Sequence, residues 1–230
     1  MSETKTLKLS RWLCLIAFLA STDVCAQTFT ETGDAGQTLG SATLVPGQIN
    51  QLNGNLSDIT SDVDLYRIIL PAVSTFTLEV SSFVVDYKAY PAFLYEPDSI
   101  LYLFDATGAP IALNDDRSIP PGDIDLLSTV TTGPLAAGTY YVAIGSYDAR
   151  AIDSENDQWW LQDQPIPADF DTLNGFVFEL AEAPFLDYFD DPEPYPSSDY
   201  SIEMSATTVP EPNAAFLLVG LSCLLWRRRR

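Results

Sequence analysis

Apolar and polar residues alternate one by one along much of the chain, which is the period of a β-strand with one buried face. Within residues 74–81, Phe76, Leu78 and Val80 are apolar and the residues between them are polar. Seven stretches with this alternation or with a short apolar run each predict a strand: 65–70, 74–81, 100–104, 126–130, 139–144, 176–180 and 199–205. Turn residues at 105–108 and 136–138 separate some of them. The pattern predicts an all-β fold, an antiparallel β-sandwich or jelly roll.

Three stretches do not follow this alternation. Residues 83–98 mix aromatic residues with two prolines, residues 148–171 are acidic, and residues 184–198 are rich in proline, acidic and aromatic residues. None has an alternating core pattern of its own, so we expect acidic loop insertions within one body, residues 27–208, and no second domain.

The charge is strongly unbalanced. The chain of 230 residues has 32 acidic and 11 basic residues, a formal charge of −21 and no histidine. Without histidine, this chain cannot form a Ser-His-Asp triad or a histidine-ligated zinc site. The acidic surplus argues against a nucleic-acid partner. Residues 27–208 hold 29 of the acidic residues and only four basic ones, a composition that attracts divalent cations.

The first 26 residues are typical of a signal peptide. Basic residues precede an apolar run at 12–20, and Val24-Cys25-Ala26 offers small or modest side chains before cleavage between Ala26 and Gln27. We therefore expect an N-terminal signal helix and passage through the export machinery. The three cysteines, at positions 14, 25 and 223, all lie outside the expected body, which therefore has no disulfide framework.

Residues 209–230 form a second hydrophobic signal. Val209, Pro210, Glu211 and Pro212 precede an apolar segment at 214–226, and the chain closes with the basic cluster Arg227, Arg228, Arg229 and Arg230. At ~1.5 Å per residue the apolar segment makes roughly 20 Å of helix, shorter than the ~30 Å hydrocarbon core. The arginines favour the cytoplasmic side and leave the body across the membrane. We expect a short linker at 206–208 before this tail.

This tail resembles the PEP-CTERM sorting signal of Gram-negative bacteria in the order and spacing of its three parts. The resemblance implies that a C-terminal helix holds the exported protein in the inner membrane, on the periplasmic side. It also implies that an exosortase acts near Pro-Glu-Pro and that the product reaches the cell surface or an extracellular polysaccharide matrix.

The body has a family resemblance of its own, carried by motifs that occur in a fixed order. These are Asp62-Val63-Asp64-Leu65-Tyr66, followed by the stretches 99–108, 111–116 and 135–143. They resemble the bacterial pre-peptidase C-terminal (PPC) domain and its DVUA-type PEP-CTERM relatives. The resemblance implies a β-sandwich without catalytic machinery, so we expect no enzyme activity and a structural or adhesive role.

One group of oxygen-bearing residues is a candidate calcium site. Asp62 and Asp64 precede a predicted strand, and Asn114, Asp115 and Asp116 follow another. Calcium takes six to eight oxygen ligands, often from loops. The alternative interpretation is that these side chains cap turns, as Asp and Asn often do at strand ends.

Aromatic residues in the expected insertions offer a second candidate function, binding of exopolysaccharide by ring stacking. The candidate residues are Trp159, Trp160, Tyr188 and Tyr195. The alternative is that these rings are buried against the end of the sandwich, which is common for large apolar groups. A secreted hydrolase based on paired carboxylates is a third hypothesis. It has little support, because the stretch 104–108 departs from an aspartic-protease loop and has no second copy.

Overall fold

The computed structural model describes residues 27–59, 61–85, 98–119, 123–147, 149–155, 157–159, 166, 170–178 and 197–209. In these ranges all regular secondary structure is β-strand, which confirms the all-β prediction. Nothing in the same ranges forms a helix long and apolar enough to cross a membrane. The signal helix and the C-terminal hydrophobic helix fall outside the described residues.

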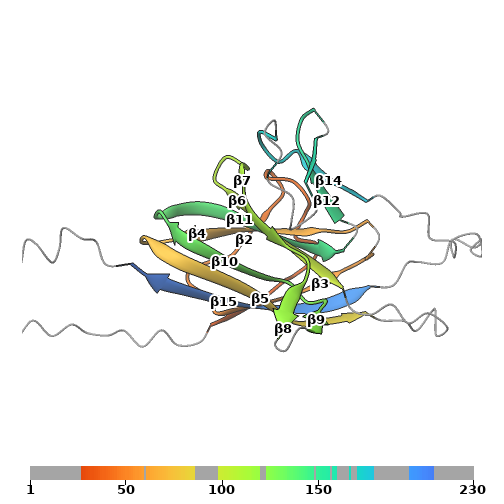
Figure 1. Cartoon of the computed structure of the whole chain (residues 1–230), viewed down its shortest axis with the longest axis horizontal. Coiled ribbons are helices and arrows are strands. Elements are labelled where there is room, and N and C mark those ends of the chain that lie inside the picture. Colours follow the sequence, from red (N-terminus) through yellow and green to blue (C-terminus); the bar gives the residue numbers. More distant parts are fainter. Residues whose placement is uncertain are drawn as a thin grey trace, which may run out of the picture.

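Two five-stranded sheets lie face to face (Figure 1). The first has the order β1 (Thr28–Thr30), β3 (Gln51–Leu56), β15 (Ser198–Thr208), β5 (Ser74–Val85) and β10 (Thr129–Leu135). The second has the order β2 (Thr43–Leu44), β4 (Asp64–Leu70), β11 (Gly138–Ser146), β6 (Ser99–Asp105) and β7 (Pro110–Asn114). Neighbouring strands are antiparallel except for the short edge strands β1 and β2, which are parallel to β3 and β4. The sandwich part of the fold prediction is confirmed.

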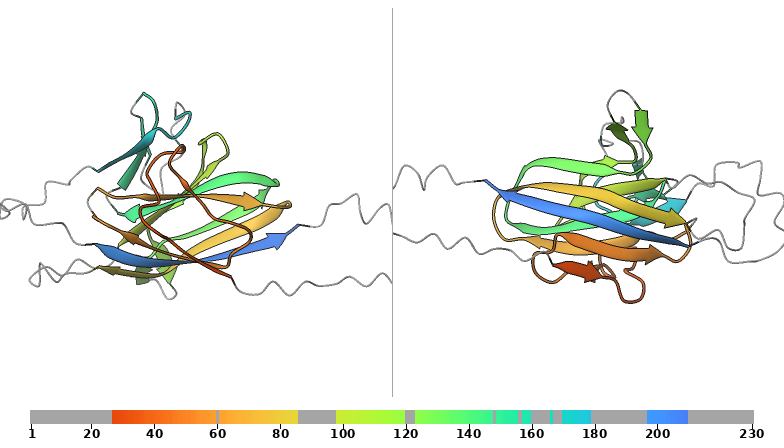
Figure 2. Two further views of the ribbon diagram at one scale, coloured as in Figure 1. Left: turned by 180° about the vertical axis from the view of Figure 1, so that it is seen from behind. Right: turned by 90° about the horizontal axis from the view of Figure 1, so that it is seen from below.

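The last strand, β15, occupies the middle of the first sheet. It pairs with β3 on one side and with β5 over its whole length on the other (Figure 2, right). The strand therefore joins the pair β1–β3 to the pair β5–β10. Residues 206–208 belong to it, so the expected linker is wrong: Ala206, Thr207 and Thr208 pair with Phe76, Thr75 and Ser74.

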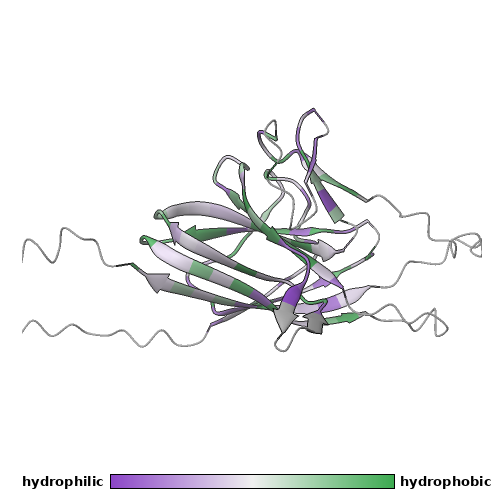
Figure 3. Ribbon diagram, in the orientation of Figure 1, coloured by the Kyte–Doolittle hydropathy of each residue, from purple (hydrophilic) through white to green (hydrophobic). Residues whose placement is uncertain are grey.

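The main core lies between the two sheets and follows the period-two pattern of the sequence. Figure 3 shows hydrophobic and hydrophilic residues alternating along the long strands. On β4, alternate side chains from Tyr66 to Leu70 point into this core, and the opposing face is supplied by alternate residues of β5 and β15. Burial of these side chains removes apolar surface from water, which is the dominant stabilising contribution in a domain without disulfides.

A third, small sheet covers the outer face of the second sheet. It consists of β12 (Ala149–Ile152), β13 (Gln158–Trp159) and β14 (Gly175–Phe178), with β12 in the centre (Figure 1). Beneath it lies a second apolar cluster built around Tyr102, Phe104, Trp159 and Phe170. The expected insertion at 148–171 is thus a folded cap in its described parts, because its alternate side chains complete a core that the sandwich alone leaves open.

The other predicted segments agree with the structure to different degrees. Five predicted strands fall within β4, β5, β6, β11 and β15. The strand predicted at 126–130 begins only at Thr129, because Asp125 Oδ1 accepts a hydrogen bond from Leu127 N and turns the chain there. A hairpin of β8 (Arg117–Ile119) and β9 (Asp123–Asp125) precedes this turn. The first residues of the insertion expected at 83–98 extend β5, whereas residues 86–97 and 184–196 are outside the described ranges.

Candidate metal centre

An acidic centre lies at one end of the sandwich, where β4 begins. Asp64 is the first residue of β4, and its side chain points between the two sheets, as those of Tyr66 and Ile68 do. Asp62 precedes it by two residues, and Asp34 comes from the loop after β1. One carboxylate oxygen from each of Asp34, Asp62 and Asp64 lies within 4.8 Å of the others.

Local hydrogen bonds hold the Asp34 loop against the start of β4. Asp34 Oδ1 accepts a 2.8 Å hydrogen bond from Gly36 N, which closes a tight turn. Gly36 has a φ of 74°, a conformation that residues with a Cβ rarely adopt. The carbonyl of Gly36 then accepts a 3.0 Å bond from Leu65 N. Loop and strand are therefore joined by the backbone itself.

Asp62 is buried and already hydrogen-bonded through both oxygens. Its Oδ2 accepts bonds from the Ser57 backbone N and the Ser57 hydroxyl, at 2.6 and 2.8 Å. Its Oδ1 accepts a 3.3 Å bond from the Gln37 amide. These donors fix the orientation of the carboxylate without neutralising its charge.

Asp64 is fully buried, with 0% of its surface exposed. Its Oδ2 accepts a 2.6 Å hydrogen bond from the hydroxyl of Tyr200 on β15, and that hydroxyl lies 2.5 Å from the hydroxyl of Tyr66. Its Oδ1 is also buried and has no hydrogen-bond partner among the described residues. An unpartnered buried carboxylate oxygen is costly, and it is the strongest sign that this centre takes a ligand.

Burial and the neighbouring carboxylates raise the pKa values of Asp64 and Glu31 at this centre. Burial raises the pKa of Asp64 to about 8; the Tyr200 hydrogen bond opposes this shift, and the carboxylates of Glu31, Asp62 and Asp34 add to it. Burial also raises the pKa of Glu31, with a further contribution from the charge of Asp62. Burial and then the charge of Asp64 raise the pKa of Tyr200, so this hydroxyl stays protonated and acts as a donor.

Four carboxylates thus meet at one end of the core, and a bound cation would relieve their repulsion. A calcium ion holds its oxygens at about 2.3–2.6 Å, so two of its ligands lie at most about 5 Å apart. The spacing of the Asp34, Asp62 and Asp64 oxygens fits that limit. The exposed side chain of Asp34 leaves the centre open toward solvent, so that water molecules can complete the coordination.

The structure does not bring Asn114, Asp115 or Asp116 to this centre. Asp64 pairs with Ile144, Ile144 with Leu101 and Leu101 with Asn114, so Asp64 and Asn114 lie in one row at the same end of the second sheet. They are three strands apart, however, which is roughly 14 Å at the usual strand spacing. Two short side chains cannot share one ion over that distance. Asp34 takes the place that the sequence-based hypothesis gave to 114–116.

The residues after β7 instead organise a turn. Asn114 Oδ1 accepts a 2.7 Å bond from Thr129 N, and its amide donates a 2.7 Å bond to the Asp116 carbonyl. Asp115 Oδ1 accepts a bond from Asp116 N at 2.9 Å. These contacts are those of the turn-capping alternative.

Of the four aromatic candidates for glycan binding, Trp159 is the only one in the described residues. It is 3% exposed and makes edge-to-face contacts with Tyr102, Phe104 and Phe170. Its ring is part of the cap core and offers no face for a sugar in this structure, so the stacking role is wrong for this residue. Trp160, Tyr188 and Tyr195 lie outside the described residues.

Most of the sorting and cleavage residues also lie outside the described ranges: Ala26, Pro210, Glu211, Pro212, Arg227, Arg228, Arg229 and Arg230. Gln27 and Val209 are described and lie at the two ends of the body. The Gln27 carbonyl accepts a 3.0 Å bond from Asn50 N, and Val209 N donates a 2.8 Å bond to the Val73 carbonyl. The first and last residues of the described body are therefore both hydrogen-bonded to the sandwich.

Sequence reasoning missed Glu31, Asp34 and Tyr200. Asp34 lies between Gly33 and Gly36, both of which have positive φ, so glycines around an acid were the available sign of a tight loop. Tyr200 lies within the strand predicted at 199–205 and faces the core. No local pattern shows that its hydroxyl reaches an aspartate 136 positions away.

No protein-family model and no curated protein matches the chain. Among solved structures, the chain is similar to the crystal structure of Aeromonas hydrophila PliG, a periplasmic lysozyme inhibitor of g-type lysozyme. The identity is 12%, the match covers 72% of this chain and 96% of that chain, and the TM-score is 0.34. A TM-score of this size does not establish a common fold.

Proposed function

We propose that this chain is an exported structural or adhesive protein of the bacterial envelope or extracellular matrix, and that calcium bound at the acidic centre stabilises its β-sandwich. The observation that carries the calcium site is the fully buried Asp64, whose Oδ1 has no partner among the described residues and whose charged neighbours are other carboxylates. The export and sorting parts of the proposal are supported by the two terminal segments of the sequence.

The three proposed ligands have different roles. Asp64 and Asp62 are buried and held in place by Tyr200, Ser57 and Gln37, so their oxygens are preorganised. Asp34 is exposed and closes the centre from the solvent side. Preorganised carboxylates lower the cost of binding, because few side chains must be ordered when the ion arrives.

Thermal unfolding of the purified chain tests the calcium site. Extracellular calcium modules bind at about 10⁻⁴–10⁻³ M, and saturation at about 100 times the dissociation constant adds about 2.7 kcal/mol to stability. We therefore expect Ca²⁺ to raise Tm by roughly 5–10 °C relative to chelator. Asp64→Asn keeps an acceptor for Tyr200 and removes the charge, so this response should be lost. Equal Tm values with Ca²⁺ and with chelator would overturn the site.

Asp105→Asn is the matched control. Asp105 Oδ1 accepts bonds from Thr107 N, the Thr107 hydroxyl and Ala109 N, and despite partial burial these bonds lower the pKa of Asp105. The substitution weakens a turn far from the metal ligands in sequence, so it should lower the baseline Tm but leave the Ca²⁺ response intact.

Cell fractionation tests the export and sorting part. We expect a chain trimmed near Ala26 and Gln27 and found outside the cytosol. Replacement of Pro210, Glu211 and Pro212 by alanine should trap the full tail in the inner membrane. An untrimmed chain that stays soluble among cytoplasmic proteins would overturn this part of the proposal.

A further inference from the structure

Strand β15 makes a contact with the acidic centre. It lies in the middle of the first sheet, between β3 and β5, although it is the last strand in the described chain. Tyr200 is 3% exposed, and its hydroxyl donates to Asp64 Oδ2 at 2.6 Å. This bond runs from β15 in one sheet to β4 in the other.

Three further contacts bring neighbouring segments to the same place. Tyr200 lies directly opposite Gly54 on β3, and the absence of a Cβ there leaves room for its ring. The next residue, Asn55, donates its backbone N–H to Glu31 Oε2 at 3.0 Å and its side-chain amide to Asp199 Oδ1 at 2.7 Å. The loop after β1, the strands β3 and β4 and the start of β15 therefore meet around the acidic centre.

We propose that a cation bound at this centre latches β15 into the first sheet, so that the sandwich is completed only where divalent cations are plentiful. The latch consists of the cation, Asp64 and Tyr200. This inference rests on the proposed calcium site and concerns what occupancy of that site does to the fold.

The physical reason is that a cation would change the free energy of inserting β15. Insertion of β15 orders the backbone of Ser198–Thr208, and this costs conformational entropy that the contacts of the strand must offset. Without a cation, the inserted strand buries Asp64 close to Asp34 and Asp62 with one of its oxygens unpartnered. A cation bound to Asp64 would partner the oxygen that the inserted strand otherwise leaves buried without a hydrogen bond. Seating of β15 through the Tyr200 bond would then bury no unsatisfied oxygen of Asp64.

Because β15 lies in the middle of the first sheet, its release would affect that whole sheet. When β15 leaves, β1–β3 and β5–β10 lose their common neighbour, since each pair contacts the other through it. The second sheet keeps its own order, because β4, β11, β6 and β7 pair without β15. The expected cation-poor state is therefore an opening of the first sheet with the second sheet retained.

Hydrogen exchange of the full chain, with and without millimolar Ca²⁺, tests the latch. We expect amides of β15 and β3 to exchange at least about tenfold more slowly with Ca²⁺, and amides of β11 and β6 to change much less. Uniform slowing in both sheets would overturn the latch and leave the calcium site standing. Absence of binding, measured by Tb³⁺ luminescence sensitised by nearby tyrosines and by calorimetry with Ca²⁺, would overturn both.

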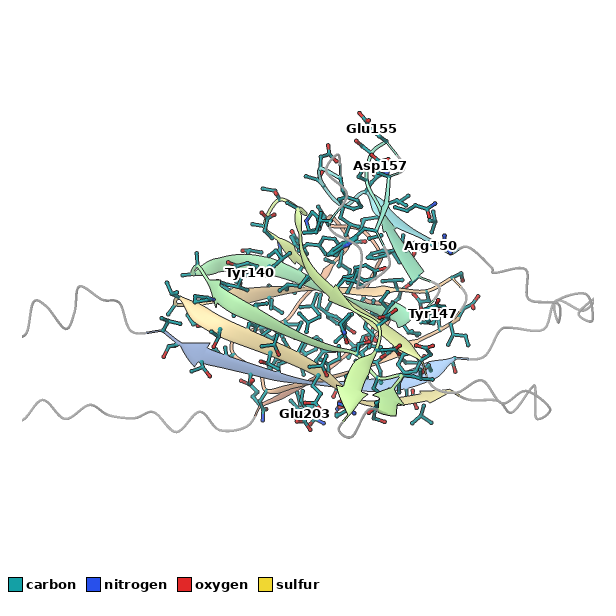
Figure 4. The ribbon with its side chains drawn as sticks, in the orientation of Figure 1. Tyr140, Tyr147, Arg150, Glu155, Asp157 and Glu203 are labelled. Carbon is teal, nitrogen blue, oxygen red and sulfur yellow. The ribbon has the colours of Figure 1, made fainter. Side chains whose placement is uncertain are left out.

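Tyr200→Phe separates ion binding from latching. The variant keeps the carboxylates of Asp34, Asp62 and Asp64 but loses the hydroxyl that orients Asp64, so Ca²⁺ should bind more weakly. At saturating Ca²⁺, the Ca²⁺-dependent protection of β15 should still fall at least about tenfold. Tyr140→Phe is the matched control, because Tyr140 on β11 is also a buried tyrosine whose hydroxyl donates one bond, to the Ala136 carbonyl at 2.9 Å (Figure 4). It should leave the protection of β15 unchanged. Full Ca²⁺-dependent protection in Tyr200→Phe would overturn the role of this hydroxyl.

Discussion

The Tyr200 hydroxyl donates a 2.6 Å hydrogen bond to Asp64 Oδ2, and the two residues belong to opposite sheets of the sandwich. Both side chains are buried, and without Tyr200 neither oxygen of Asp64 would have a hydrogen-bond partner among the described residues. This contact joins the first residue of β4 to the third residue of the last described strand, β15.

Without cations, the stability of the body should fall as the pH rises from about 5 to about 8. Burial, reinforced by neighbouring carboxylates, raises the pKa of Asp64 from 3.8 to about 8. The folded state therefore holds this proton more tightly than the unfolded state. The stabilisation is complete below the unfolded pKa and is lost as the pH approaches the folded pKa, by at most about 1.4 kcal/mol per pH unit. Thermal unfolding in chelator at several pH values measures the slope.

The same experiment with millimolar Ca²⁺ should weaken or reverse this slope, because the ion binds the ionised carboxylate and rising pH then favours binding. Asp64→Asn should flatten the chelator profile. If wild type and Asp64→Asn show parallel profiles in chelator, the raised pKa of Asp64 is not what governs the pH dependence.

Gly54→Ala should destabilise the body. A Cβ at this position would lie 2.2 Å from the Tyr200 hydroxyl oxygen and 2.6 Å from Glu31 Oε2, so both groups must move. Forced overpacking of this kind costs about 1–3 kcal/mol, measurable by denaturant unfolding. Gly133→Ala on β10 is the control, since a Cβ there meets nothing within 4 Å and the change should be nearly neutral. Equal stabilities of the two variants would contradict the close approach at Gly54.

Trp159→Ala should cost about 3–5 kcal/mol, the usual range for truncation of a buried aromatic side chain. The ring fills the space between Tyr102, Phe104 and Phe170 beneath the small sheet. Val84→Ala, at a side chain that is 58% exposed, should change stability by less than about 0.5 kcal/mol. A Trp159→Ala variant with wild-type stability would show that the cap core does not contribute to folding.

Arg117→Ala should have a small, salt-sensitive effect. Arg117 forms ion pairs with Glu79 on β5 and Asp125 on β9, and all three side chains are partly exposed. Pairs of this kind contribute about 0.2–1 kcal/mol and are screened by salt. The difference in unfolding free energy between variant and wild type should therefore shrink in concentrated NaCl. Arg67→Ala, at another exposed arginine, should show no such salt dependence, and a difference that persists in salt would contradict a purely ionic role for Arg117.

The long strands were predictable from sequence because burial of one face imposes alternation, as in β5 and β11. The strand β3 was missed, since its centre, Asn53-Gly54-Asn55, has no apolar residue on either face. The small strands β12 and β13 were interpreted as loop, because they are short and flanked by acidic residues. Glu155 and Asp157 lie at the outer tip of this cap (Figure 4), while the neighbouring Asp153 is buried and accepts backbone bonds from both residues.

The acidic centre was only half predictable. Asp62 and Asp64 are close in sequence, and the pattern that follows them predicts that they precede a strand. Their third partner depends on strand order, which local patterns do not encode: β11 and β6 lie between β4 and β7, and this separates Asn114 from Asp64. The Asp34 loop reaches β4 through the backbone bond from Leu65 N to the Gly36 carbonyl, a long-range pairing that no local pattern shows.

The course of β15 also sets how the domain carries mechanical load. Its ladder with β5 runs from Ser198 to Thr208, and the adjoining Val209 is still bonded to Val73. A pull on the chain beyond Val209 acts along the axis of a central strand, so it loads the rungs on both flanks together in shear instead of one at a time. If calcium seats β15 as proposed, the ion would set the tensile strength of a domain pulled from this end as well as its melting point.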